Sequence, residues 1–345
     1  MRESIYPTNP LKSWFTTVLS LICLCSSIAC QGQQKKSNMS ETTKNPLLCS
    51  PETGLCEIPG AKDSSASPFI TIQEKPLKMV YFTDPICSSC WGIEPQLRRL
   101  KLEYGQFIEI EYRMGGLLPS WDIYNSGGIS KPSDVAHHWD EVSGHYDMPI
   151  DGDVWLEDPL PSSYPPSIAF KAAQMQDGHK AILFLRRIRE MVFMEKKNIT
   201  RWEHLSAAAV AVGLDAAQLE NDYKGAAKTA FEADLALARQ MGVRGFPSVF
   251  ISDTKGQQLF VYGSKPYTAY TEALKKLLPG IQPKTYDNSL ETLLLYYPTL
   301  TVKEFSLLSG QERNAAAAAL QQAQKAGKLQ ALHCKNGDLY FQNRN

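Results

Sequence analysis

No sign of charge dominates this 345-residue chain, in which 36 Lys and Arg balance 36 Asp and Glu. We therefore expect no nucleic-acid partner and no charge-driven binding to a membrane surface. Beyond the N-terminal segment no apolar run approaches the ~18 residues of a spanning helix, so none is expected. Histidine is also scarce, and His137, His138 and His145 lack the i, i+4 spacing of a helical metal site. The sequence predicts neither a metal nor a cofactor.

Cysteine is the residue type that carries chemical information here, and Cys87 and Cys90 form a Cys-x-x-Cys pair. Residues 77–83 before the pair are apolar and aromatic, which is typical of a buried strand, whereas residues 93–102 after it have the helical period. This arrangement places Cys87 at a helix N-terminus, where unpaired N–H groups and the helix dipole favour a thiolate. We predict that Cys87 is the nucleophile and Cys90 the resolving thiol.

Two prolines strengthen the redox interpretation. Pro95 lies inside the predicted helix, where a proline costs ~3 kcal/mol and asks for an explanation. Gly245-Phe246-Pro247 is a turn that precedes an apolar strand at 248–251. Both features resemble the thioredoxin superfamily, in which a proline at this spacing kinks the active-site helix and a cis-proline loop faces the reactive cysteine. The resemblance implies that Phe246 and Pro247 hold an extended substrate strand.

The order of the predicted elements resembles that of the DsbA-like proteins, which are thioredoxin folds with a large helical insertion before the cis-proline loop. The likeness is to their FrnE and YjbH branch, and it rests on Asp84-Pro85 before the Cys-x-x-Cys-Trp motif, on Arg113-Met114-Gly115-Gly116-Leu117, and on Ser162-Ser163-Tyr164-Pro165. It implies an α/β class with a thioredoxin-like domain at 69–280 and a helical insertion at about 130–240. The resemblance itself covers roughly residues 69–279.

The dipeptide Ser88-Ser89 departs from the Pro-His of strongly oxidising relatives. Serine hydroxyls donate hydrogen bonds to a thiolate but carry no charge, so we expect a less extreme redox potential. Such a potential is compatible with reduction and isomerisation as well as with oxidation. Phe246 is larger than the Val or Thr often found before the loop proline, and we expect it to narrow the substrate groove or to form an aromatic wall.

Residues 1–29 resemble a secretory signal, with basic residues ahead of an apolar run and small residues after it. Cys30 follows directly, as in a bacterial lipobox, although Ser27 occupies the position of the usual Leu. We expect an exported protein, anchored by a lipid on Cys30 at the periplasmic face of a bacterial membrane; an ordinary cleaved signal and an uncleaved anchor are the alternatives. Residues 30–68 have the polar composition of a flexible tether.

Cys49 and Cys56 lie in this tether and flank a turn that contains Pro and Gly. Cysteines of exported proteins tend to pair, so we expect a small structural disulfide; a second redox pair that exchanges with Cys87 and Cys90 is the alternative. A zinc site built from these four cysteines is less favoured, because six residues separate the first two. Cys334 stays unpaired in this count.

Residues 287–345 are predicted to form a separate small module. Three helical stretches precede two strand-like stretches that flank Asn336-Gly337, which is a strong hairpin signal. Helices followed by a hairpin resemble a winged-helix module. Its mild excess of basic residues forms no stripe, so we interpret the module as a packing or protein-contact unit rather than a DNA-binding one.

Together these features predict a membrane-tethered thiol–disulfide oxidoreductase or isomerase that acts on exported proteins with thiols or disulfides and is reset by a redox partner. Cys87 would form the mixed disulfide with the substrate, and Cys90 would resolve it. The alternative is a non-catalytic protein-binding module, because YjbH-like relatives are protease adapters; this role is cytoplasmic and requires another purpose for residues 1–29. A glutathione-dependent isomerase of the kappa type is disfavoured, because those enzymes generally lack the cysteine pair.

Overall fold

The computed structural model describes residues 48–49, 55–57, 75–124 and 127–343. The chain divides into two units, residues 1–44 and 45–345, and every described residue belongs to the second. The predicted signal segment and Cys30 lie outside the described residues, as does the predicted tether apart from two short strands. Within the described part of the chain, no helix has the length and apolar character needed to cross a membrane.

A six-stranded sheet with the strand order β1-β2-β6-β5-β3-β4 carries the fold. β3 pairs in parallel with β4 and antiparallel with β5. Alternating residues of β3 point to opposite faces, so that Tyr81 belongs to the main core while Phe82 packs with Phe250 and Phe260 on the other face. The strands are β1 (Leu48–Cys49), β2 (Leu55–Glu57), β3 (Leu77–Thr83), β4 (Ile108–Met114), β5 (Ser248–Asp253) and β6 (Gln258–Tyr262).

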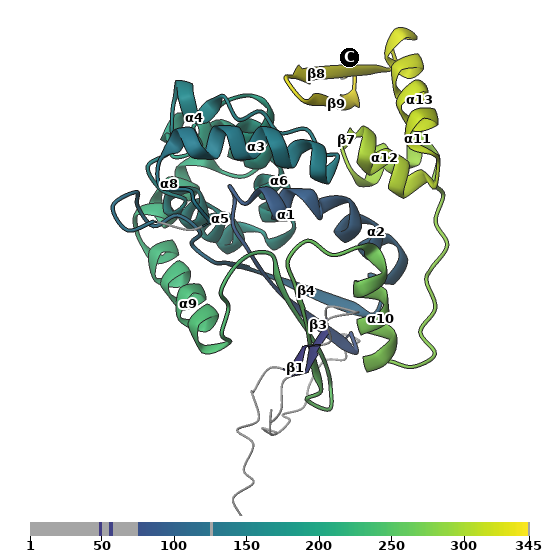
Figure 1. Cartoon of the computed structure of the whole chain (residues 1–345), viewed down its shortest axis with the longest axis horizontal. Helices are drawn as coiled ribbons and strands as arrows, with labels where there is room; N and C mark the ends of the chain where they lie inside the picture. The colour runs from purple at the N-terminus through teal and green to yellow at the C-terminus, as the bar shows by residue number, and fades with distance from the viewer. Residues whose placement is uncertain (1–47, 50–54, 58–74, 125–126, 344–345) are drawn as a thin grey trace, which may run out of the picture. The chain divides into compact units, whose positions relative to one another are not determined.

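Helices cover both faces of this sheet, as expected for a mixed α/β fold with extra helices. α1 (Ser88–Gly92) and α2 (Glu94–Tyr104) follow β3, and α10 (Tyr267–Leu277) follows β6 and packs on α2. The segment between β4 and β5 is the helical insertion (Figure 1). Its helices are α3 (Pro132–Tyr146), α4 (Val154–Glu157), α5 (Tyr164–Gln176), α6 (Gly178–Met194), α7 (Trp202–Ala211), α8 (Ala216–Lys224) and α9 (Ala226–Gln240).

The C-terminal module has its own three-stranded sheet, in the order β7-β9-β8, and its own apolar core. The β8–β9 hairpin pairs Cys334 with Gly337, so its two-residue turn is Lys335-Asn336, one residue earlier than the sequence suggests. The Asn336 side chain explains the shift, because it donates to the Ile150 carbonyl of the insertion at 2.8 Å. The elements are α11 (Leu290–Tyr296), β7 (Thr299–Thr301), α12 (Val302–Ser309), α13 (Arg313–Lys325), β8 (Leu329–Cys334) and β9 (Gly337–Gln342).

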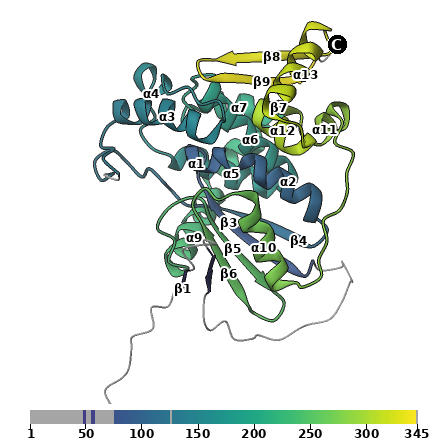
Figure 2. The same ribbon diagram turned by 45° about the vertical axis from the view of Figure 1, so that its right-hand side comes forward.

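Charged side chains join this module to the rest of the second unit. Figure 2 shows the helices and strands of the module from a second side. Glu304 of α12 is fully buried and accepts hydrogen bonds from Arg186 of α6 at 2.8 and 3.1 Å. The same carboxylate lies 3.3 Å from Arg98 of α2. At the hairpin tip, Lys335 forms an ion pair with Asp140 of α3 at 2.5 Å. The module thus contacts α2, α3 and α6 and belongs to the compact unit of residues 45–345.

Candidate active site at the dithiol

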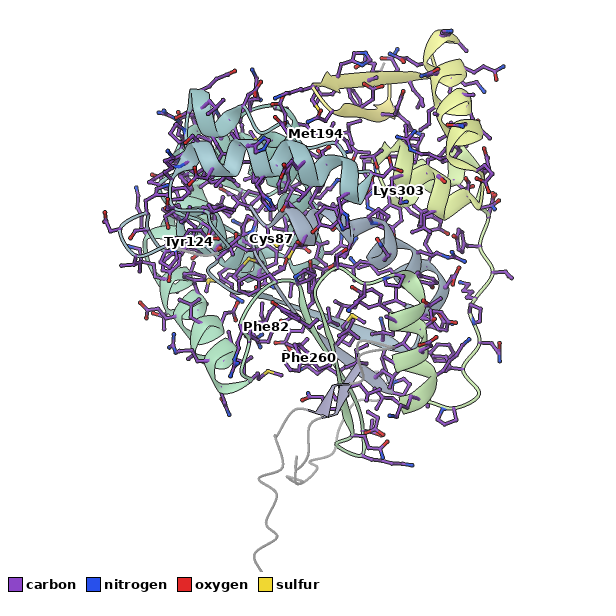
Figure 3. The ribbon with its side chains drawn as sticks, in the orientation of Figure 1. Phe82, Cys87, Tyr124, Met194, Phe260 and Lys303 are labelled. Atoms are coloured by element: carbon purple, nitrogen blue, oxygen red, sulfur yellow. The ribbon has the colours of Figure 1, made fainter. Side chains whose placement is uncertain are left out.

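Cys87 lies in the turn from β3 to α1, a few residues beyond Phe82 (Figure 3). Its Sγ accepts a hydrogen bond from the backbone N–H of Cys90 at 3.3 Å, which makes Cys87 the N-cap of α1. Both side chains are free thiols and are buried, with 5% and 0% of their surface exposed. The structure thus places the pair at a helix N-terminus, where N–H groups lack intrahelical partners.

The helix after the pair is interrupted. α1 ends at Gly92 and α2 begins at Glu94, with Ile93 capping both. Pro95 therefore lies in the first turn of α2 and not in a helix interior, where the sequence places it. A proline in the first turn gives up no intrahelical hydrogen bond, because the N–H groups there have no partner within the helix. The penalty expected for an interior proline is absent at this position.

The loop before β5 faces the dithiol. The Phe246–Pro247 peptide bond is cis, and Cys87 Sγ donates to the Phe246 carbonyl oxygen at 3.7 Å. Ser248 closes the turn by donating to the Gly245 carbonyl at 2.8 Å. The two residues predicted to hold a substrate strand are thus adjacent to the predicted nucleophile. A polypeptide that pairs with the backbone of this loop would bring its own sulfur to Cys87.

Gly115 leaves room for the Phe246 ring. A Cβ on this glycine would lie 1.9 Å from Phe246 Cε1, far inside van der Waals contact. We expect Gly115→Ala to displace the ring and the loop beside Cys87, and to lower the free energy of unfolding by about 1–3 kcal/mol. Gly144→Ala is the matched control, because a Cβ on Gly144, in helix α3, would have nothing within 4 Å. Urea unfolding measures both variants, and equal midpoints would refute this role of Gly115.

Asp84 is fully buried and joins three segments of the site. Its carboxylate accepts hydrogen bonds from the N–H of Ile86 at 3.0 Å, the N–H of Leu117 at 2.7 Å and the hydroxyl of Ser163 at 2.8 Å. The three motifs on which the family resemblance rests therefore meet at one carboxylate. Burial raises the pKa of Asp84 to about 6, although the hydrogen bonds act in the opposite direction.

The charge on Asp84 acts on Cys87. Burial and contact with Cys90 raise the pKa of the Cys87 thiol, and the Asp84 carboxylate raises it further. We expect Asp84→Asn to react with iodoacetamide a few-fold faster than the wild type at pH 7.5, because the variant lacks this negative charge. At pH 5 the rates should agree, since Asp84, with its pKa of about 6, is then mostly neutral. Equal rates at both pH values would contradict an electrostatic effect of Asp84.

Arg189 of α6 supplies the buried positive charge of the site. Its side chain is 1% exposed and donates to the Thr83 hydroxyl at 2.6 Å and to the Asp84 carbonyl at 3.2 Å. It also lies 3.3 Å from the Glu94 carboxylate. Sequence analysis missed Arg189, and the only signal for it was an arginine among the apolar residues of the predicted helix. Helical periodicity gives no indication of what such a residue contacts.

The pKa shifts make Cys90 the more readily ionised thiol of the pair. Burial opposes ionisation of Cys90, but the interaction with the Cys87 side chain and the charge of Arg189 outweigh it and lower the pKa of Cys90. The expectation of a Cys87 thiolate considered only the helix N-terminus, whereas burial raises the pKa of Cys87. A Cys90 thiolate can take the proton of Cys87 as Cys87 attacks, so Cys87 keeps its predicted role as the attacking sulfur.

The two serines between the cysteines are placed differently. Ser89 Oγ lies 2.6 Å from the hydroxyl of Tyr146, the last residue of α3. The Tyr146 ring also fills the space beside Gly92, where a Cβ would lie 2.5 Å from its Cγ. Ser89 therefore ties the active-site helix to the insertion, a role the sequence did not indicate. Ser88 is nearly buried and lines a cavity beside Cys87.

The predicted cysteine pair of the tether falls in two short strands. The backbone register places Cys49 opposite Cys56, and Cys56 opposite Phe260 of β6. Residues directly opposed on antiparallel strands have Cα atoms ~4.5–5.5 Å apart, a separation that a disulfide spans. The disulfide predicted between Cys49 and Cys56, structural or redox-active, stays a prediction. Cys334 is a half-buried free thiol on β8.

Comparison with known proteins assigns the chain to a family. The sequence model of the Thioredoxin family matches residues 81–272. The ClpXP adapter protein SpxH of Halalkalibacterium halodurans is 34% identical over 304 residues, which cover 86% of this chain and 97% of that protein. The chain belongs to the SpxH family of thioredoxin-fold proteins. SpxH of Bacillus subtilis is 32% identical over 269 residues, which cover 75% of this chain and 88% of that protein.

A solved structure agrees with the fold of this SpxH-family chain. A proposed protein disulfide isomerase of Nitrosomonas europaea has a TM-score of 0.52 and 20% identity, and the match covers 59% of this chain and 97% of that one. The predicted resemblance to the YjbH branch of DsbA-like proteins is confirmed, since the curated relatives are SpxH proteins of that branch. The name of these relatives, ClpXP adapter protein, favours the predicted alternative, a protease adapter, over the predicted oxidoreductase.

Proposed function

We propose that this SpxH-family chain is an adapter that binds client polypeptides at its dithiol face and presents them to a ClpXP protease. The observation that carries the proposal is the match to SpxH of Halalkalibacterium halodurans, which spans 304 residues and 97% of that protein. The match is longer than the thioredoxin-like segment at 81–272, so the likeness extends beyond that segment.

The docking of the C-terminal module supports an adapter role. An adapter has to hold two partners at once, and two surfaces in a fixed relation serve this purpose. The contacts of Glu304 with Arg98 and Arg186 are buried and join the module to α2 and α6. A client at the dithiol and a second protein on the module would therefore be held by one rigid body.

Binding of purified ClpX to the immobilised full-length chain tests the proposal. We expect saturable binding by the wild type and by a variant with both Cys87→Ser and Cys90→Ser, because presenting a client needs no turnover of the dithiol. Absence of ClpX binding by the wild type would overturn the adapter function. Cell fractionation is the second test, since an adapter for a cytoplasmic protease has to be cytoplasmic, and the export predicted for residues 1–29 would separate the two proteins.

Thiol–disulfide exchange is the second candidate function, and the contact of Cys87 with the Phe246 carbonyl favours it. Cys87 attacks one sulfur of a client disulfide, the client S–S bond breaks, and the other client sulfur leaves as a thiolate. Cys90 then attacks the Cys87 sulfur, which releases the reduced client and leaves a Cys87–Cys90 disulfide. A dithiol partner that supplies two electrons would complete the cycle.

Trapping separates exchange from binding alone. The Cys90→Ala variant cannot resolve the mixed disulfide, so client proteins should accumulate on Cys87 and be released by dithiothreitol. The wild type should in parallel reduce the disulfides of insulin. If neither mixed disulfides nor insulin reduction is observed, the dithiol has no exchange function.

A further inference from the structure

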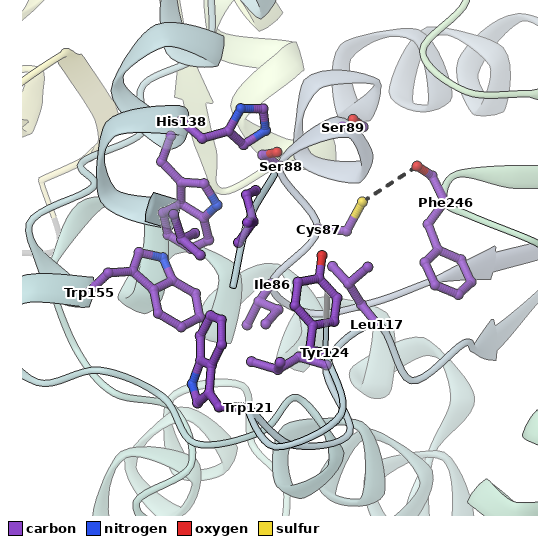
Figure 4. A pocket seen from close by; sticks show the side chains of 14 residues that line it. Ile86, Cys87, Ser88, Ser89, Leu117, Trp121, Tyr124, His138, Trp155 and Phe246 are labelled. Carbon is purple, nitrogen blue, oxygen red and sulfur yellow. Dashed lines mark hydrogen bonds between the residues drawn. The ribbon is translucent and has the colours of Figure 1, made fainter. Parts of the chain in front are cut away.

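A cavity of about 170 Å³ opens beside Cys87. Cys87 and Phe246 lie on one side of it and Trp121 and Trp155 on the other, with Tyr124 between them (Figure 4). The walls come from the active-site turn, from the segment after β4, and from helices α3 and α4 of the insertion. None of the described lining residues is Asp, Glu, Lys or Arg. His138, Tyr124 and the Cys87 thiol are its titratable groups, and the other lining side chains are uncharged, so the cavity suits an uncharged guest.

Three tryptophans form the wall far from Cys87. The ring of Trp155 meets Trp121 and Trp139 edge to face, with centroids 5.9 and 5.2 Å apart. Such edge-to-face contacts are the arrangement that aromatic rings prefer, and a further ring is a natural addition to them. An apolar cavity of ~150 Å³ is large enough to hold benzene. The dimensions and the chemistry of the wall thus fit an aromatic side chain.

The N–H group of Trp155 is buried and unpartnered among the described residues. The residue as a whole is 2% exposed. In contrast, the Nε1 of Trp121 donates to the Leu160 carbonyl at 2.9 Å. A buried donor without an acceptor costs about 1–3 kcal/mol, but Figure 4 shows the Trp155 nitrogen on the ring edge away from Cys87. The guest that fits the cavity is therefore defined by its aromatic body.

We propose that this cavity, which we term the tryptophan pocket, receives an aromatic side chain of the client from a position one or two residues away from the client cysteine that meets Cys87. The inference rests on the proposed client binding and specifies which clients are held. A client strand that pairs with the Phe246 backbone places its cysteine at Cys87, and the neighbouring side chains then lie beside the pocket. Two exposed apolar residues, Ile123 at 73% and Leu156 at 60%, adjoin the pocket residues in the sequence and extend the apolar surface.

The pocket is tested with peptides whose cysteine forms a mixed disulfide with an aromatic thiol. The protein used is the full chain with the Cys90→Ala substitution. Each peptide is Gly-rich, has one cysteine bonded to 5-thio-2-nitrobenzoate, and has Phe, Tyr, Ala or Asp at one position before or after it. Cys87 attacks the cysteine sulfur of the peptide. The S–S bond between that sulfur and the aromatic sulfur breaks, and the coloured aromatic thiolate leaves with the electron pair. At one of the positions we expect Phe or Tyr to lower the half-saturating concentration about tenfold relative to Ala, and Asp to have no such effect.

Variants then connect the preference to the pocket. Trp121→Ala should abolish the preference for aromatic side chains, and Trp155→Leu should weaken it, because each variant removes a ring from the wall. Val210→Ala is the control, because Val210 is an apolar side chain that is 64% exposed and does not line the pocket. Equal half-saturating concentrations for the Phe, Ala and Asp peptides at every position, or no reaction with any peptide, would overturn the proposal. Binding of ClpX is measured separately, so loss of the proposed adapter function is distinguishable from loss of the pocket.

Discussion

The Arg189→Met variant will ionise the first thiol of the pair at a higher pH than the wild type and will react several-fold more slowly with iodoacetamide at pH 7. The reason is that the charge of Arg189 lowers the pKa of Cys90 against the effect of burial. Methionine keeps much of the side-chain volume but removes the charge. Loss of a positive neighbour favours the neutral thiol, so the pKa rises. The rates of reaction with iodoacetamide from pH 5 to pH 10 measure the pKa of the first thiol to ionise.

Arg187→Met is the matched control for this experiment. Arg187 lies two residues before Arg189 in α6 and carries the same charge. It pairs with Glu190 and Glu195. Its pH profile should superimpose on that of the wild type. Circular dichroism checks that Arg189→Met is folded, since Glu94 keeps Arg98 as a partner at 3.7 Å. If the Arg189→Met profile also superimposes on the wild type, Arg189 does not stabilise the thiolate.

Glu304→Gln is expected to lower the free energy of unfolding by about 3–5 kcal/mol, because it removes a carboxylate that two buried arginines share and leaves an excess of buried positive charge. The carboxylate lies 2.8 Å from Arg186 and 3.3 Å from Arg98, and both arginines are nearly inaccessible to solvent. Glutamine keeps the size of the side chain but not its charge. Urea unfolding gives the magnitude, and limited proteolysis between α10 and α11 shows whether the module detaches.

An exposed glutamate provides the comparison. Glu312 precedes α13 and is exposed, and it forms no ion pair with another residue that the structure describes. Glu312→Gln should change the free energy of unfolding by less than about 0.5 kcal/mol. A loss of similar size for Glu304→Gln would show that packing, and not charge, holds the module in place.

The elements around the dithiol could be predicted because their signals are local. Neighbouring residues are enough to recognise these signals. They are an apolar run before Cys87, a helical period after it, and a proline before another apolar run. The contacts that complete the site join distant positions. The hydrogen bonds of Ser89 with Tyr146 and of Arg189 with Thr83 span 57 and 106 positions. Periodicity contains no information on such partners.

Glu304 shows how a correct local prediction can coexist with a missed tertiary role. The sequence marks Thr301 as a helix cap, and in the structure Thr301 Oγ1 accepts from the Glu304 N–H while the Glu304 carboxylate accepts from the Thr301 N–H. This capping box is local and recognisable. The pairing of the same carboxylate with Arg186 depends on the docking of the module, so the sequence left the module separate.

The contact of Cys87 with the Phe246 carbonyl has a consequence for the synthesis of the chain on the ribosome. The two residues are 159 positions apart, and chains grow at ~5–20 residues per second, so roughly 8–30 s pass before the loop that faces the dithiol has been made. During this time the nascent chain carries two thiols whose covering segments do not yet exist. The oxidants and thiols around the ribosome or translocon therefore decide the redox state in which the site first closes.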